Sequence, residues 1–165
     1  MSSPGFPHSP DEPDLPHSPD EPVGAGQLQT LQPLTNDLIA AVLSARGFSF
    51  YTDGDGDLVG RWDDNLIYFF RLGPDGELLQ VRTMAATTFP IDRVPELYAF
   101  CNAWNHDRLW PKAFVHVNDD GSARVCGEVT ADLAQGVTLH QLDQLINCGI
   151  STGCQLAESA AELRP

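Results

Sequence analysis

Proline occurs at every third residue from Pro4 to Pro22, and this spacing limits what the first part of the chain can form. Proline has no backbone N–H and a fixed φ, so neither a helix interior nor a central strand can contain such a run. The period instead matches polyproline II, which has 3 residues per turn and places all the rings on one edge. The segment also carries five acidic residues and no basic ones: Asp11, Glu12, Asp14, Asp20 and Glu21. We therefore expect residues 1–33 to be a disordered acidic tail with polyproline II tendency, and residues 34–165 to form one domain.

The proline run, residues 4–22, is compatible with two functions. One is a solubilising, semi-rigid spacer, which this composition favours. The other is a ligand for a proline-binding groove, because PxxP repeats along the run. SH3 and WW domains mostly select basic or aromatic residues beside the prolines, whereas this run carries acids, so we favour the spacer. A functional tail with the domain as its anchor stays open as an alternative.

The composition excludes several classes of function. The formal net charge is −14 over 165 residues, whereas nucleic acids and anionic membranes attract basic surfaces. No apolar run approaches the roughly 20 residues that span a bilayer. The first residues, MSSPGFPHSP, lack the pattern of a secretory signal. We therefore expect a cytoplasmic protein with no nucleic-acid partner and no membrane partner, and with four free thiols.

The apolar pattern after residue 34 predicts an α+β domain. Helices are expected over 36–46, over 92–106 and from 138 onward, with Thr35 capping the first and a capping box of Thr138 and Gln141 starting the last. We expect Gly149 and Gly153 to break or bend the last helix. Strands are expected over 48–52, 58–62, 66–72, 78–87, 113–117 and 123–130, with the turn signals GPDG and NDDG inside two hairpins. The order α-ββββ-α-ββ-α predicts an antiparallel sheet packed with helices.

No motif in the sequence identifies a catalytic, cofactor or metal site, and we expect none of these. The DGDGD segment at 53–57 resembles the start of a calcium loop, but Leu58 stands where the sharp turn needs glycine, so we expect a turn between strands. One alternative stays open, a small enzyme or ligand-binding protein with a site around the 113–130 hairpin. Its candidate residues are Cys126, His116, Glu128 and Lys112.

Several short motifs together resemble one protein family. They are FCNAWN at 100–105, LWPKA at 109–113, GVT at 136–138 and QLD at 141–143. These motifs are similar to those of the YbjN-domain family, and the stretch 58–83 resembles its actinobacterial branch. The resemblance covers about residues 34–158 and leaves out the proline run.

The resemblance implies both a fold and a function. YbjN domains are similar in fold to type III secretion chaperones, which are small acidic homodimers that hold partner segments over apolar surfaces and have no enzymatic activity. It therefore implies a non-enzymatic protein-binding module, chaperone-like or regulatory, with a role in stress or sensory responses. It also implies a homodimer contact through helix 92–106. As residues that bind an unidentified protein partner we expect Trp104, Asn105, Trp110 and Lys112.

Overall fold

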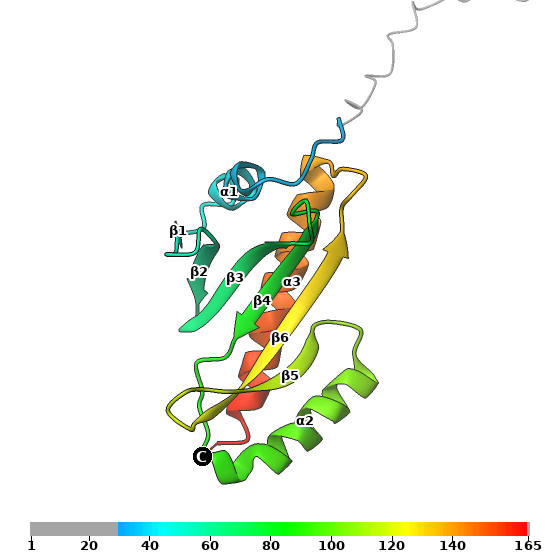
Figure 1. Cartoon of the computed structure of the whole chain (residues 1–165). Coiled ribbons are helices and arrows are strands. Elements are labelled where there is room, and N and C mark those ends of the chain that lie inside the picture. Colours follow the sequence, from blue (N-terminus) through cyan, green and yellow to red (C-terminus); the bar gives the residue numbers. More distant parts are fainter. Residues whose placement is uncertain (1–29, 165) are drawn as a thin grey trace, which may run out of the picture.

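Six strands of one sheet form the framework of the domain (Figure 1). The computed structural model describes residues 30–164, so most of the predicted tail, including the proline run, lies outside the described residues. The elements are α1 (Asn36–Ala45), β1 (Phe50–Thr52), β2 (Leu58–Trp62), β3 (Asn65–Leu72), β4 (Leu78–Met84), α2 (Val94–Asp107), β5 (Lys112–Val117), β6 (Ala123–Asp132) and α3 (Leu139–Ala161). One turn of 3₁₀ helix, Ile91–Arg93, precedes α2. The predicted α+β class and the order α-ββββ-α-ββ-α are confirmed.

The two predicted hairpin units join into this sheet through β4 and β6. The strand order is β1-β2-β3-β4-β6-β5, and every neighbouring pair is antiparallel. β6 pairs with β4 along residues 126–132, but with β5 only along residues 123–128. The last part of β6 therefore has a strand neighbour on the β4 side alone.

The helices pack on one face of this sheet. In the view of Figure 1, α3 runs behind β4 and β6, while α2 lies beside β5. Side chains alternate between the two faces of a strand, and Leu79, Val81 and Thr83 of β4 point toward α3. The buried core includes Ile39, Leu43, Phe69 and Ile146 at the α1 end, and Phe89, Leu97, Val125 and Leu156 at the α2 end. None of the helices in the described part of the chain combines the length and the hydropathy of a bilayer-spanning segment.

α3 is one continuous helix, and the prediction that Gly149 and Gly153 break or bend it is wrong. Both glycines are buried against β4. A Cβ on Gly149 would lie 2.6 Å from side-chain atoms of Val81, and a Cβ on Gly153 would lie 1.9 Å from Thr83 Oγ1. The two glycines thus allow the helix to approach the sheet closely. The predicted capping box of Thr138 and Gln141 is present at the start of α3.

The other differences from the predicted elements are at their ends. β1 is shorter than 48–52, β4 ends at Met84 instead of 87, and β6 continues to Asp132 instead of 130. The helix expected over 92–106 begins as the 3₁₀ turn and becomes α-helical at Val94. Gln32, which the sequence assigned to the tail, exchanges two backbone hydrogen bonds of 3.0 and 2.9 Å with Val137. The folded part of the chain therefore begins before residue 34.

Candidate functional site

Aromatic and basic side chains line the sheet face opposite the helices. Because Val81 and Thr83 point toward α3, Arg82 between them points to the other side. The register of β3, β6 and β5 brings further side chains beside Arg82. We call this set the open face, which consists of Tyr68, Phe70, Arg82, Phe114, Arg124 and Glu128. Within residues 30–164 no helix covers it (Figure 1).

Arg82 lies between aromatic rings of the open face. Its guanidinium carbon is 5.0 Å from the centroid of the Phe70 ring and 5.9 Å from that of the Phe114 ring. Tyr68 stacks on Phe70 with ring centroids 5.3 Å apart and planes 8° from parallel. A cation–π contact at an exposed site stabilises by about 0.5–1 kcal/mol. These contacts hold Arg82 in a defined position on the sheet.

The open face has more positive than negative charge. Arg82 Nη2 and Lys112 Nζ donate hydrogen bonds to the two oxygens of one carboxylate, that of Glu128, at 3.4 and 3.0 Å. Arg124 adds another positive charge, and its Nη1 donates to the backbone oxygen of Ala85 at 3.4 Å. This local excess of positive charge stands out in a chain of net charge −14.

Two polar atoms of the open face are buried without a hydrogen-bond partner among the described residues, Arg82 Nε and Arg124 Nε. Buried donors without an acceptor are rare in folded proteins, and each costs about 1–3 kcal/mol. Both atoms are covered by neighbouring atoms, so a bound segment would meet the outer N–H groups of the two guanidinium groups first. The open face is therefore suited to a ligand that combines acceptor oxygens with apolar side chains.

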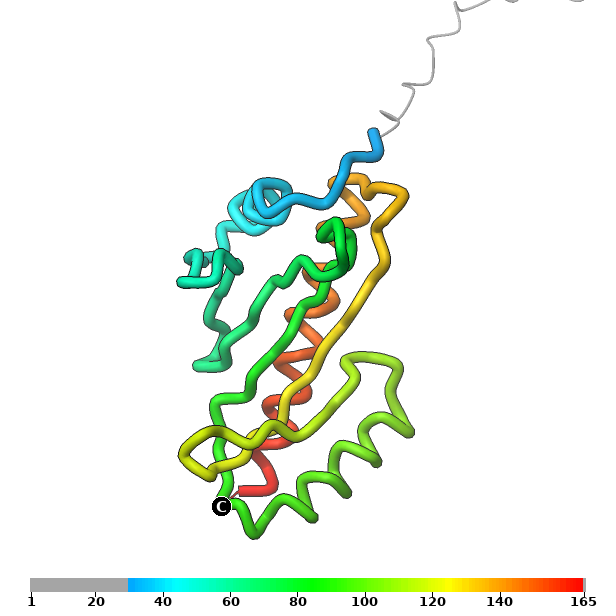
Figure 2. Tube along the Cα trace, viewed as in Figure 1, coloured from blue at the N-terminus to red at the C-terminus, as the bar shows by residue number. Residues whose placement is uncertain are grey.

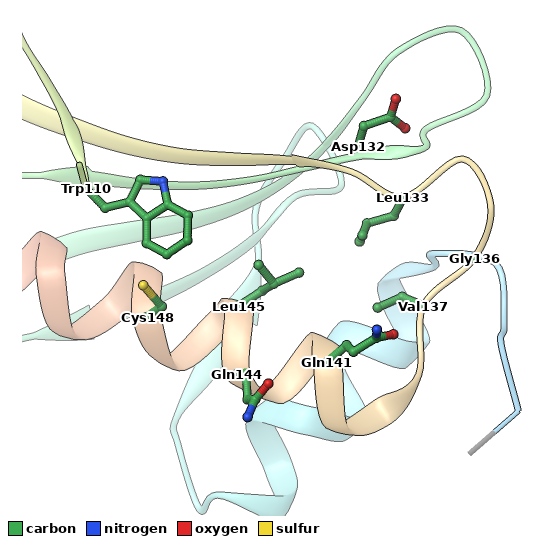
Figure 3. Close-up of a pocket in the computed structure, with 9 residues that line it drawn as sticks. All are labelled: Trp110, Asp132, Leu133, Gly136, Val137, Gln141, Gln144, Leu145 and Cys148. Atoms are coloured by element: carbon green, nitrogen blue, oxygen red, sulfur yellow. The ribbon is translucent and has the colours of Figure 1, made fainter. Parts of the chain in front are cut away.

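A second hollow lies on the helix side, between α3 and the segment that follows β6 (Figure 3). Its volume is about 560 Å³, and we call it the Trp110 groove. Trp110, 42% exposed, stands at one end beside Cys148, and Gly136 is at the other end. The walls between them include Leu133, Val137, Gln141, Gln144 and Leu145.

The structure divides the four predicted partner-binding residues between different roles. Trp104 is 4% exposed, and its Nε1 donates to the backbone oxygen of Pro111 at 3.1 Å. The Asn105 side chain exchanges two hydrogen bonds, of 2.9 and 2.7 Å, with the backbone of Ala113. Both residues thus join α2 to the edge strand β5. Trp110 lines the groove, while Lys112 lies beside the open face, so the four side chains do not share one surface.

The alternative site around the 113–130 hairpin lacks an accessible nucleophile. Burial raises the pKa of the Cys126 thiol to about 12, and the residue is 2% exposed. A catalytic cysteine instead needs a stabilised thiolate that a substrate can reach. Glu128 and Lys112 do meet, as an ion pair, and His116 lies opposite Arg124 in the strand register. This alternative gains no support from the geometry.

The DGDGD segment forms the predicted turn, between β1 and β2. Asp53 Oδ1 accepts hydrogen bonds from the backbone N–H groups of Asp55 and Asp57, at 2.9 and 3.0 Å. Among residues 30–164, no three His, Cys, Asp or Glu side chains lie close enough together to hold a metal ion. All four cysteines fall within this range and are free thiols.

The fold and the open face define a small α+β domain with helices on one side of its sheet and the half-buried open face on the other. The chain belongs to the YbjN family. The family model matches residues 35–162 and describes its members as "putative bacterial sensory transduction regulator". A search of the curated proteins found no match.

Solved structures with a similar fold include proteins from two different organisms. The crystal structure of YbjN from E. coli is similar with a TM-score of 0.70 and 20% sequence identity, and the match covers 82% of this chain and 97% of that one. An uncharacterized protein from Methanothermobacter thermautotrophicus is similar with a TM-score of 0.55 and 11% identity, over 80% of this chain and 100% of that one. At these identities the similarity extends to the fold and not to particular residues.

The open face was not among the predicted sites. It depends on pairing between strands that are far apart in the sequence, above all β4 with β6. One signal pointed toward it: the segment LIYFFRL at 66–72 is apolar at both alternating sets of positions. One set is buried under α3, and Tyr68 and Phe70 of the other set belong to the open face. An apolar second face on a half-covered strand marks a surface that is free to bind.

Proposed function

We propose that the protein is a non-enzymatic protein-binding module, regulatory or chaperone-like, that holds an extended partner segment across its open face. The observation that carries this proposal is the guanidinium group of Arg82 between the rings of Phe70 and Phe114, on a sheet face that none of the described helices covers. An extended segment offers a backbone carbonyl at every residue, which guanidinium N–H groups can bind. Its apolar side chains would pack on the rings of Tyr68, Phe70 and Phe114. The positive charge of the face favours a segment that contains Asp or Glu.

Properties of the whole chain support the same proposal. The family description supports a role in regulation. The net charge of −14 supports a protein rather than a nucleic acid as the partner. The four free thiols support a reducing compartment, and we include a cytoplasmic location in the proposal.

Site-specific photo-crosslinking in the native cell tests the proposal. Phe70 is replaced by p-benzoylphenylalanine, and Leu139 serves as the matched control because it is 44% exposed on α3, away from the open face. We expect covalent adducts with a protein from the Phe70 position and none from the Leu139 position. The additional substitution Arg82→Ala should reduce these adducts strongly. Absence of adducts at Phe70, or equal adducts at both positions, would contradict the proposal.

We further propose that two copies of the chain associate through the outward side of α2. The buried residues of this helix are Leu97, Cys101 and Trp104, which face the sheet and α3. Tyr98 points away from them and is 55% exposed, and Ile91 just before the helix is 52% exposed. Aromatic residues at the surface are enriched in protein interfaces. These side chains would form the centre of the homodimer contact.

A further inference from the structure

The described chain begins at one end of the Trp110 groove. Gln32 pairs with Val137, a residue of the groove wall, through two backbone hydrogen bonds. Leu31 lies against Gly136, since a Cβ built on Gly136 would be 3.2 Å from Leu31 Cβ. Figure 2 shows the start of the described chain next to the connection between β6 and α3. The residues that precede Thr30 in the sequence are therefore tethered at the Gly136 end of the groove.

We propose that the proline run of this chain, residues 4–22, binds in the Trp110 groove of the same molecule. Its proline rings pack against the indole of Trp110, and the side-chain amides of Gln141 and Gln144 donate hydrogen bonds to its backbone carbonyls. Proteins bind polyproline II segments in this way, in aromatic-lined grooves, because such a segment has no internal hydrogen bonds and exposes its carbonyls.

The two glutamine amides are available for this contact. Gln141 Oε1 accepts hydrogen bonds from N and Oγ1 of Thr138, both at 3.1 Å. These bonds orient the amide and leave Nε2 without a partner in the described part of the chain. Gln144 is exposed, and it lines the groove one turn further along α3. The two donors are three residues apart, so they lie on the same side of the helix.

The length of the groove is similar to the distance between successive prolines of the run. Along α3 the groove runs from Gln141 to Cys148, which is about 10 Å at 1.5 Å per residue. Two prolines three residues apart in polyproline II are about 9 Å apart. One PxxP unit therefore fits along the groove at a time. The tether from Pro22 to Thr30 reaches up to about 28 Å when extended, and Gly24 and Gly26 within it allow the chain to turn back.

The acidic residues of the run are compatible with this arrangement. None of them falls on the proline positions of the three-residue period, so in polyproline II they project from the other two edges. With the prolines in the groove, the carboxylates point into solvent and away from Asp132. The remaining repulsion between an acidic segment and an acidic domain is screened by salt, so binding strengthens as salt is added. Binding of the same segment to the positively charged open face would weaken instead.

Nuclear magnetic resonance on the full chain tests the proposal. The native chain is compared with a full-length variant in which residues 4–22 keep their composition but lose the three-residue proline period. We expect nuclear Overhauser contacts between proline ring protons and the indole of Trp110 in the native chain, and their loss in the variant. The indole N–H signal of Trp110 should shift between the two proteins, while those of Trp62 and Trp104 coincide. Added salt should increase the contacts.

Substitutions in the domain provide the matched controls. Gln144→Ala should weaken the contacts, whereas Leu109→Ala should leave them unchanged, because Leu109 is 82% exposed beside Trp110 and does not line the groove. Identical Trp110 signals in the native and rearranged chains would overturn the proposal. Contacts found only between differently labelled copies would assign the groove to a second chain, and contacts to Tyr68 or Phe70 would assign the run to the open face. Each of these last two results would also overturn the proposal. Neither the groove nor this experiment depends on the proposed function of the open face.

Discussion

At the scale of single residues, the turn between β2 and β3 is made by two aspartates in an unfavourable backbone conformation. Asp63 and Asp64 have φ values of 48° and 67°. Such a two-residue turn matches the twist of the strands, but it favours glycine at the second position. We expect Asp64→Gly to raise the free energy of unfolding by about 0.5–1 kcal/mol, because relief of the left-handed conformation outweighs the entropy of the added glycine.

Urea unfolding of the native chain and the variant measures this effect. Asp64→Ala is the matched control, because it also removes the carboxylate but keeps the Cβ, and it should not stabilise. The ion pair between Arg61 and Asp64 is long, 3.9 Å, and exposed, so its loss has little effect in either variant. Equal stabilities of the glycine and alanine variants would show that the turn carries no conformational cost.

The buried thiol of Cys126 makes the stability of the fold depend on pH. Its pKa is raised by burial to about 12, whereas a thiol in an unfolded chain has a pKa of about 8.5. Above that pH the unfolded chain loses a proton that the folded chain keeps, so stability falls as pH rises. We expect Cys126→Ala to flatten this decline between about pH 9 and 11 in unfolding titrations. The quantity to compare is the slope of the unfolding free energy against pH, because the packing lost in Cys126→Ala lowers stability equally at every pH. Cys148→Ala, at a more exposed thiol, should change it less.

At the scale of elements, the contact of α3 with β4 depends on the glycines of the helix. A Cβ at Gly153 would lie 1.9 Å from Thr83 Oγ1, so Gly153→Ala forces the helix and the strand apart. We expect a loss of about 1–3 kcal/mol, although alanine is the better helix former. Ser151→Ala, at an exposed position of the same helix, should be close to neutral. Thr83→Ala combined with Gly153→Ala should recover part of the loss. Strict additivity of the two substitutions would contradict the proposed clash.

This contact also marks how much of the fold could be predicted from the sequence. The capping box at Thr138 and the turns GPDG and NDDG are local signals, and the elements they bound were predicted to within a few residues. The role of Gly153 depends on Thr83, which is far away in the sequence. From local propensity alone a glycine in a helix indicates a break, whereas a glycine under a sheet indicates close packing. Only the tertiary contacts of the glycine distinguish these two cases.

At the scale of the whole molecule, the same distinction holds for the candidate sites. Trp104 and Asn105 lie in motifs shared with the YbjN family and were predicted to bind a partner. The structure shows that both side chains instead join α2 to β5. Trp110 and Lys112, predicted in the same way, lie at two different surfaces. The open face could not be predicted, because Arg82 acquires its neighbours only when β3, β4, β6 and β5 pair in register. Short motifs thus located residues that hold elements together more readily than the surface those elements form.

The homodimer proposed through α2 depends on the aromatic side chain of Tyr98. An interface centred on an aromatic residue loses about 2 kcal/mol or more when that residue is replaced, which is at least a thirtyfold change in Kd. Tyr98→Asp should exceed this, because it removes the ring and brings two carboxylates together at the centre of a symmetric contact. We expect sedimentation equilibrium to give a dimer for the native chain and a monomer for Tyr98→Asp at micromolar concentration. Leu139→Asp, at a residue 44% exposed on α3, adds the same charge away from α2 and should remain dimeric. A native chain that stays monomeric up to near-millimolar concentration would rule out the dimer, and a dimer that tolerates Tyr98→Asp would assign the contact to another surface.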